Sequence, residues 1–214
     1  MRSQIYNMKK FFDFNEQELK LFSKLNTQKK IQDFLNTIPA NFEKTGATSL
    51  SPREVLKQNR AHCIEGAVLA AVILWYHGQK PLLLDLVSNN SDDDHVVALF
   101  KQGKFWGAIS KTNHAVLRYR EPVYRDVREL VMSFFHEYFK DSGKKTLRSY
   151  SAPFDLSKIK DKTWLTCEES IWEINNDLTD SKHYKILNQS QVKNLRLAEP
   201  IEIEAGKLTE WKRK

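Results

Sequence analysis

Apolar positions crowd together most densely between Cys63 and Tyr76, where nearly every residue is hydrophobic or small. A helix that is apolar almost all the way round is buried on most of its faces. Gly78 follows this run and can end the helix, because glycine readily adopts the left-handed backbone that helix C-termini often use. The pattern therefore predicts a central buried helix that begins at Cys63.

Two amphipathic helices are predicted upstream, over residues 11–24 and 29–38, where apolar residues recur at helical spacing. Asn15 or Asn26 could cap their starts, and Pro39 ends the second helix. A short third helix is predicted just before Cys63. It has a serine cap at position 51, a proline at its first helical position and a glutamate three residues past the cap.

A small antiparallel sheet is predicted after the central helix. Residues 81–87 have the composition of a strand, and a polar loop over 88–94 follows. Residues 95–100 and 105–109 flank a short connection that contains Gly103, which predicts a hairpin. Three antiparallel strands behind one buried helix form the simplest assembly of these elements.

The second half of the chain predicts mostly helices and loops. A helix is expected to start at Glu121 and Pro122 and to run to about Phe139, with Val123 among its inward residues. Another helix is expected over 167–178, with Thr166 as its cap and Glu169 as the partner in a capping box. The chain from Asn188 onward has weak periodicity and is expected to be peripheral.

Length and composition fit one soluble domain over residues 1–214, and the predicted elements make it an α+β domain with a helical and irregular extension at about 121–214. The apolar run is too short to span a bilayer, and the N-terminus lacks a secretory hydrophobic region, which predicts a cytoplasmic protein without a membrane partner. Cys63 and Cys167 are both expected to be free thiols.

The net charge of +7 is concentrated at the two ends of the chain. By side-chain count, residues 1–60 carry about +5, 61–120 about +1, 121–180 about −3 and 181–214 about +4. Basic ends can attract nucleic acid, but no RNA-binding motif accompanies them, so a solvated surface is the favoured interpretation.

The candidate chemistry lies in the nearly neutral part of the chain, at Cys63 and His95. A cysteine in the first turn of a helix is close to unpaired backbone N–H groups and to the positive end of the helix dipole, both of which favour the thiolate. His95 opens a strand directly after a polar loop. A histidine that reaches the thiol from a neighbouring strand would lower the pKa of the thiol further.

The order of these features resembles the transglutaminase-like superfamily of the papain-like cysteine-protease fold. The resemblance covers about residues 30–112 and includes Ser51 to Leu56, Cys63 at the head of an apolar helix, Asp94-His95-Val96 before a strand pair, and Trp106. It implies that Cys63 is the nucleophile, that His95 is the base, and that acyl groups are cleaved or transferred through a thioester.

The third catalytic position departs from the pattern of that family. Counting along the hairpin puts Ser110 where an aspartate usually orients the imidazole, and a neutral serine supplies little electrostatic support. Asn113 is an equal candidate, because its amide carbonyl can accept the imidazole N–H. For the oxyanion, the Cys63 N–H and the side-chain amides of Gln58 and Asn59 are the candidate donors.

Other charged residues near the site have simpler explanations. His62 is expected to point elsewhere and to act only as a local positive charge, and Glu65 to interact with the helix dipole. Residues 92–95 could suggest a metal, but four consecutive residues of an extended segment cannot all face one ion, so a solvated acidic loop is favoured. The basic stretch 111–120 could bind an acidic group or simply be surface.

The sequence therefore predicts a cysteine-dependent amide or peptide hydrolase, or an acyl transferase, that needs no cofactor and acts on a peptide or a small amide or ester. The alternative is an inactive binding module of the same fold, for an acidic or peptide partner, which the serine at position 110 favours. The substrate, the choice between hydrolysis and transfer, and the oligomeric state stay open.

Overall fold

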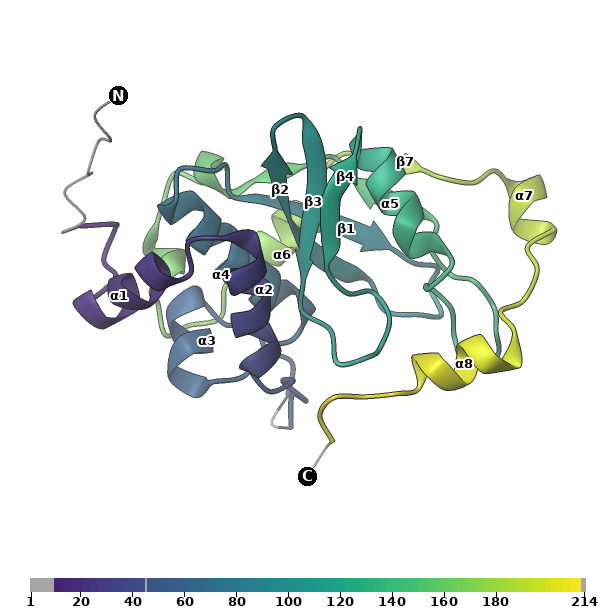
Figure 1. The fold of residues 1–214 in the computed structure, drawn as a ribbon, viewed down its shortest axis with the longest axis horizontal. Helices are drawn as coiled ribbons and strands as arrows, with labels where there is room; N and C mark the ends of the chain where they lie inside the picture. Colours follow the sequence, from purple (N-terminus) through teal and green to yellow (C-terminus); the bar gives the residue numbers. More distant parts are fainter. Residues whose placement is uncertain (1–9, 45, 213–214) are drawn as a thin grey trace.

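The protein has an α+β architecture in which helices surround one antiparallel sheet (Figure 1). This computed structural model describes residues 10–44 and 46–212. Residues 1–9, where the sequence predicts no secretory leader, and the basic residues 213–214 lie outside the described residues. Seven strands form one sheet in the order β4-β3-β2-β1-β5-β7, and β6 also pairs with β1. The strands are β1 (Leu82–Val87), β2 (His95–Gln102), β3 (Phe105–Ser110), β4 (Arg120–Tyr124), β5 (Ser149–Ser151), β6 (Phe154–Asp155) and β7 (His183–Lys185).

Helices cover both faces of this sheet and form two hydrophobic clusters. One cluster joins α1 to α4 and α6 to the first face, and the other joins α5 to the second face. The helices are α1 (Glu16–Lys24), α2 (Gln28–Thr37), α3 (Pro52–Gln58), α4 (Cys63–Tyr76), α5 (Val127–Phe135), α6 (Trp172–Thr179), α7 (Gln189–Lys193) and α8 (Pro200–Gly206), with short 3-10 turns η1 (Leu156–Lys158) and η2 (Thr163–Leu165).

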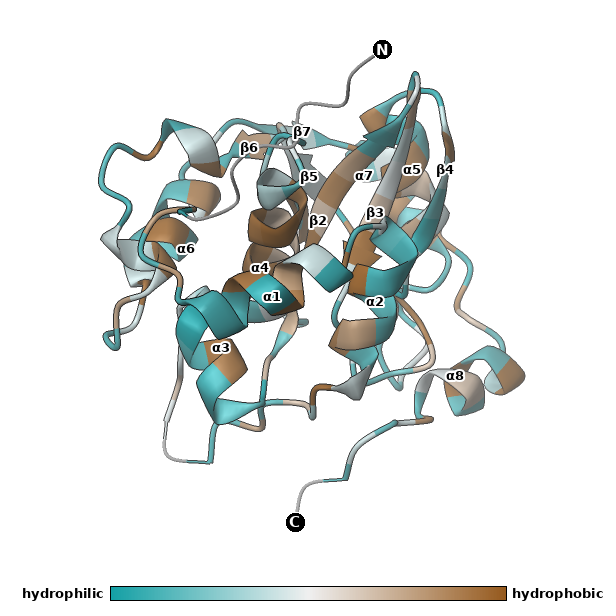
Figure 2. Cartoon of the chain, turned by 60° about the vertical axis from the view of Figure 1, so that its left-hand side comes forward, coloured by the Kyte–Doolittle hydropathy of each residue, from teal (hydrophilic) through white to brown (hydrophobic). Residues whose placement is uncertain are grey.

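The central buried helix is confirmed, and α4 has the predicted bounds. All of its residues from Ile64 to Leu74 are buried, and Figure 2 shows it as a hydrophobic rod enclosed by its neighbours. Gly78 follows with a φ of +82°, the left-handed conformation expected after a helix end. The packing around α4 fixes the position of its first residue, Cys63.

The helices before α4 agree with the predicted pattern and differ in detail. The cap of α1 is Asn15, which forms a capping box with Glu18, so the helix begins later than predicted. The cap of α2 is Thr27 rather than Asn26, because the Thr27 side chain accepts the Lys30 N–H. Ser51 caps α3 as predicted, accepting the Glu54 N–H at 3.2 Å.

The predicted hairpin is confirmed as β2 and β3, with Gly103 at φ +60° in its turn. Both strands run one or two residues further than the pattern indicated, and Val97 pairs with Ser110. Four more strands extend the sheet beyond the predicted three. β5 and β6 pair with β1, which lies much earlier in the sequence, so no local pattern predicts that pairing.

The predicted helix from Glu121 is wrong at its start, because residues 120–124 form the strand β4. Pro122 is tolerated there because β4 is an edge strand, where a missing N–H need not break a sheet hydrogen bond. Val123 is 61% exposed rather than inward. The helix itself, α5, begins after Asp126, whose side chain accepts the Glu129 N–H at 2.8 Å.

The helix predicted from Cys167 is also shorter than expected, since α6 begins at Trp172. Thr166 ends the 3-10 turn η2 instead of capping α6, and its N–H donates to Thr163 O at 3.0 Å.

Within the described residues, no helix combines the length and the hydrophobicity needed to cross a membrane.

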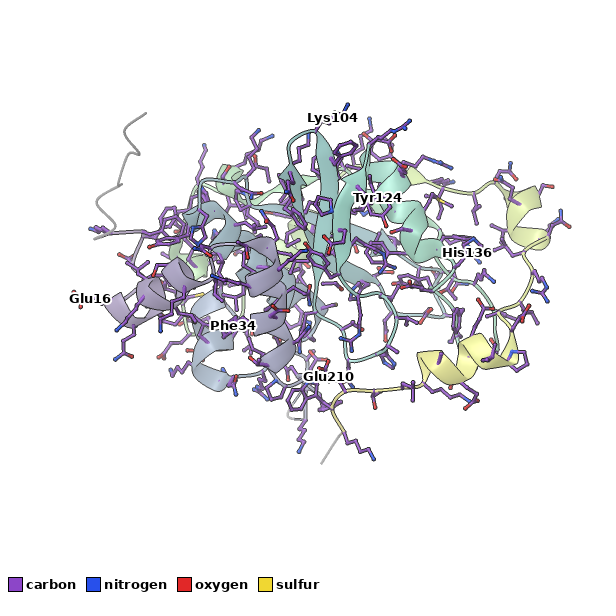
Figure 3. The ribbon with its side chains drawn as sticks, viewed as in Figure 1. Glu16, Phe34, Lys104, Tyr124, His136 and Glu210 are labelled. Carbon is purple, nitrogen blue, oxygen red and sulfur yellow. The ribbon has the colours of Figure 1, made fainter. Side chains whose placement is uncertain are left out.

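The C-terminal tail is peripheral, as the sequence predicts, since neither α7 nor α8 has a buried residue, but it makes defined contacts with the rest of the chain. After α8 it pairs with the loop that follows β3: the Ala115 N–H donates to Leu208 O at 3.0 Å, and the Glu210 N–H donates to Asn113 O at 2.9 Å. Figure 3 shows the hairpin residue Lys104 at the upper edge of the molecule and Glu210 at the lower edge. The tail therefore borders the end of the sheet at which β2 begins.

Candidate active site

A cleft of about 660 Å³ opens at the end of the sheet where β2 begins, and Cys63 and His95 line its wall. The start of α4 contributes His62 and Cys63, and the start of β2 contributes His95. Residues 40–42, the acidic residues 92–94, the loop after β3, the chain after α5 and the helix α8 also line the cleft. The structure thus brings together the two residues that the sequence singled out for covalent chemistry.

The Cys63 thiol is half-buried and free, and its pKa falls to about 5. Burial alone would raise this pKa, but hydrogen bonds and charge interactions with the imidazoles of His62 and His95 outweigh it. At neutral pH the sulfur is therefore a thiolate. A thiolate is the form of cysteine that attacks carbonyl carbon.

The ring of His95 is anchored by Ser110, whose Oγ lies 2.8 Å from Nε2. The single hydroxyl proton of Ser110 is donated to Leu117 O at 2.5 Å, so Oγ must accept the N–H of the imidazole. This hydrogen-bond pattern assigns the proton to Nε2 and leaves Nδ1 as the nitrogen that can accept and return a proton. Ser110 therefore orients the ring as an acid would, without the negative charge.

The acceptor of the Ser110 proton is itself held in place. Leu117 has a φ of +59°, a left-handed conformation that is unfavourable for leucine and occurs where surrounding contacts enforce it. Its N–H donates to Glu137 Oε2 at 2.8 Å, and the same oxygen receives Arg120 Nη2 at 2.6 Å. A carboxylate thus fixes the loop whose carbonyl fixes Ser110. No sequence pattern indicates this role of Glu137, because it lies just after α5 and contacts a loop that is distant in the sequence.

The backbone of Ser110 is clamped as well. Gln32 of α2 accepts the Ser110 N–H at 2.9 Å and donates to Ser110 O at 2.8 Å, and both contacts are buried. These two bonds tie the end of β3 to the first sheet-covering helices. Ser110 consequently has little freedom to move away from His95.

Asn113, the other candidate partner of His95, is not brought to the ring. Its side chain donates to Trp211 O at 3.0 Å and accepts the Trp211 N–H at 2.8 Å. Asn113 lines the cleft, but its amide secures the C-terminal tail. The reason is that the chain turns away from the sheet directly after Ser110, where β3 ends.

Gln58 and Asn59 are not brought into the cleft either. Gln58 Nε2 donates to Glu54 Oε2 at 2.7 Å, and its Oε1 accepts from Arg60, so the amide is engaged on the surface. Asn59 is exposed and ends α3 with a φ of +48°. The backbone N–H of Cys63, in the first turn of α4, remains the oxyanion donor that the sequence proposed.

His62 does not point away from the thiol, contrary to the sequence prediction. It is the N-cap residue of α4, and its ring interacts with the Cys63 sulfur while its Nε2 lies 3.0 Å from Thr48 O. Glu65 is part of the same network, since its Oε2 accepts the His62 N–H at 2.9 Å. This bond from the Glu65 side chain to the N-cap backbone is one half of a capping box, and a glutamate three residues after the cap is the sequence signal for that half.

The basic loop after β3 does not offer free cations to an acidic substrate. Lys111 is 2% exposed, and its Nζ donates to Leu35 O at 3.1 Å and to Ile38 O at the end of α2. Burial lowers the pKa of Lys111 to about 8. Arg118 pairs with Glu210 at 3.2 Å, and Arg120 with Glu137. These side chains hold structure together.

The acidic loop before His95 is likewise engaged in local contacts. Asp94 Oδ1 accepts the Ser88 N–H at 2.7 Å, and Asp92 accepts the Thr146 hydroxyl. Across residues 10–44 and 46–212, no group of three or more histidine, cysteine, aspartate or glutamate side chains is placed to hold a metal ion.

A second buried carboxylate, Asp85 of β1, acts on the site at longer range. Burial and the charge of Asp94 raise its pKa to about 6, against the effect of His183, whose Nε2 lies 3.5 Å from Asp85 Oδ2. The thiolate of Cys63 raises it further. The negative charges of Asp85 and of the Cys63 thiolate therefore repel each other, so each disfavours the ionised form of the other.

Comparison with family models gives no match for this chain, and comparison with curated proteins gives none either. The geometry of the cleft is therefore the basis for assigning a function to this chain.

Substituting Ser110 with alanine should lower turnover by about tenfold or more, because the imidazole N–H and Leu117 O would both lose their partner in a buried site. The measurement is steady-state turnover of any ester or amide that the wild type cleaves. Thermal unfolding of the same variant serves as the control, since a change in turnover without loss of folded protein isolates the effect on His95. Unchanged turnover in a folded variant would contradict this role of Ser110.

Proposed function

We propose that this protein is a cysteine-dependent amide hydrolase or acyl transferase that acts through a thioester. The observation that carries the proposal is a half-buried thiol with a pKa of about 5, in a cleft shared with an imidazole whose far nitrogen is anchored on Ser110. A low-pKa thiol that is accessible from a cleft is typical of reactive rather than structural cysteines. The order of Cys63, His95 and a polar third residue supports a transglutaminase-like activity on a papain-like core.

The reaction begins when the Cys63 thiolate attacks the carbonyl carbon of a bound acyl group and forms a C–S bond. The carbonyl π electrons move to the oxygen, which the Cys63 N–H and the positive end of α4 stabilise. When the oxyanion collapses, the bond to the leaving amine or alcohol breaks, and the leaving group takes up a proton from Nδ1 of His95, which received it from the Cys63 thiol when the thiolate formed.

The second half of the reaction releases the acyl group. His95, now neutral at Nδ1, accepts a proton from water or from an amine as that nucleophile attacks the thioester. The C–S bond breaks and returns the thiolate. Water gives a hydrolase, and an amine gives an acyl transferase. No cofactor enters any of these steps, and the substrate class is a peptide or a small amide or ester.

The proposal includes a cytoplasmic location, which the two free cysteines support because a thiol nucleophile must stay reduced.

The alternative function, a binding module without turnover, is favoured by a single observation. The group on the far side of His95 is a neutral hydroxyl and not a carboxylate, so the imidazolium is stabilised less during the reaction.

Acylation by an activated ester tests the proposal. Incubation with p-nitrophenyl acetate followed by intact-protein and peptide mass spectrometry should show one acetyl group, on Cys63. Cys167 is the matched control, because it is also half-buried and free, but burial raises its pKa. We expect Cys167→Ala to acylate like the wild type and Cys63→Ala to show no acylation.

Two outcomes would count against the enzymatic proposal. Labelling that is equal at the two cysteines would show that Cys63 has no special reactivity. An acyl adduct that forms on Cys63 but is never released to water or to any amine tested would favour the binding module instead.

A further inference from the structure

The cleft contains a second imidazole that the reaction above does not use. His62 precedes the nucleophile in the sequence, and its side chain is 24% exposed. Its Nε2 faces three oxygens, Thr48 O at 3.0 Å, Glu65 Oε1 at 3.3 Å and Glu43 Oε1 at 3.7 Å. A ring nitrogen that is surrounded by acceptors carries its proton, so the bond to the Cys63 sulfur is left to the other ring nitrogen.

The carboxylate of Glu65 behind this ring is completely buried. Its oxygens accept four donors: Thr48 Oγ1 at 2.7 Å, the Leu50 N–H at 3.0 Å, Asn41 Nδ2 at 3.0 Å and the His62 N–H at 2.9 Å. This carboxylate favours a positive charge on His62, which is the one cationic partner in this network.

We propose that His62 is a positioning residue that remains an imidazolium and holds the Cys63 thiolate, which leaves His95 free to exchange protons with the substrate. In its catalytic part, this inference rests on the proposed function. A single imidazole that stabilises a thiolate must lose that role whenever it gives its proton away. Two imidazoles divide the work between a fixed charge and a mobile proton.

The titration behaviour of the cluster agrees with this division. Burial lowers the pKa of His62, but its hydrogen bond to Cys63 and the charges of Glu65 and Cys63 raise it to about 9. The titratable groups that face the ring are Cys63 and Glu65 of α4 and Glu43 of the preceding loop, while His95 reaches the same sulfur from β2. At neutral pH, His62 is therefore protonated while the thiol is not.

The pH dependence of Cys63 alkylation by iodoacetamide tests the proposal without any substrate. For the wild type, the rate should be half-maximal near pH 5, the pKa of the thiol, and reach its plateau about one to two pH units higher. In His62→Gln, the fixed charge is lost, the pKa of the thiol rises, and the rate at pH 6 should fall about tenfold. His136→Gln is the matched control, because His136 is exposed and lies outside the cleft.

An alkylation profile for His62→Gln that superimposes on that of the wild type would overturn the proposal. If His62→Gln does not fold, NMR titration of the wild type and of Cys63→Ser tests the same proposal. By NMR titration of the ring signals, His62 should stay protonated to about pH 9 in the wild type and titrate at lower pH in Cys63→Ser. An identical His62 titration in both proteins would also overturn it.

Turnover separates a positioning role from a structural one. For His62→Gln, activity should recover as the pH is raised past the new pKa of the thiol, because His95 is still present. A loss of activity that is the same at every pH would overturn the positioning role. Failure of the proposed function is distinguishable, since it would appear as an absence of turnover in the wild type while the alkylation results still hold.

Discussion

Replacing His95 with glutamine should lower turnover by about a thousandfold, because the variant loses the group that protonates the leaving amine and activates the second nucleophile. Glutamine is chosen because its amide can still donate to Ser110 Oγ, the acceptor that lies 2.8 Å from His95 Nε2. The local structure is then preserved while the proton transfer is removed. The measurement compares steady-state turnover with the amount of acyl-enzyme formed in the first turnover.

The expected pattern is specific to a base that acts in both half-reactions. With an activated ester, whose leaving group needs no proton, His95→Gln should still acylate Cys63, since His62 still favours the thiolate, and should then stall. With an amide, neither step should proceed. His136→Gln, an exposed substitution on the chain after α5, should retain wild-type turnover. Equal turnover by His95→Gln and the wild type would contradict the role of His95.

Local sequence signals were sufficient for the part of the fold that holds the nucleophile. The apolar run from Cys63 and the glycine at 78 determine α4 through interactions within one segment, and its bounds are confirmed. The hairpin that joins β2 and β3 is determined in the same way, and its register brings Ser110 beside His95. Two neighbouring elements therefore carry most of the site.

Contacts between distant segments could not be predicted in this way. Glu137 reaches Leu117, and Asn41 and Thr48 reach Glu65, across separations that no periodicity records. The sequence pattern does not predict the strand β4, because a proline after a glutamate is typical of a helix start. Pro122 is compatible with a strand here only because β4 lies at the edge of the sheet.

The neutral partner of His95 gains significance from these distant contacts. Where an aspartate is expected, the neutral Ser110 supplies no negative charge to the imidazole of His95. A fixed imidazolium at His62 reduces the need for that charge, because His62 then stabilises the thiolate. With a positive charge already held against the sulfur by Glu65, the imidazole of His95 needs orientation more than it needs a counter-ion. Ser110, clamped by Gln32 and Leu117, supplies that orientation.

Substituting Gly66 with alanine should destabilise the protein by about 2 kcal/mol, although alanine normally stabilises a helix interior by about 1 kcal/mol relative to glycine. A Cβ at position 66 would lie 2.4 Å from Lys111 Cβ and 2.9 Å from its Cγ, distances at which the lysine must move. The Lys111 amine is buried and donates to Leu35 O and Ile38 O, so its displacement would also leave buried carbonyls unpaired.

Equilibrium unfolding in denaturant measures this effect, and Gly206→Ala provides the matched control. Gly206 also lies in a helix, but the atoms nearest to its added Cβ are ring carbons of Phe139 at 3.2 and 3.4 Å, which can shift at little cost. We expect Gly206→Ala to change the free energy of unfolding by less than about 0.5 kcal/mol. A Gly66→Ala variant as stable as the wild type would show that Lys111 is not fixed between α4 and α2. Because Lys111 directly follows Ser110, that result would also remove one of the restraints on the candidate catalytic site.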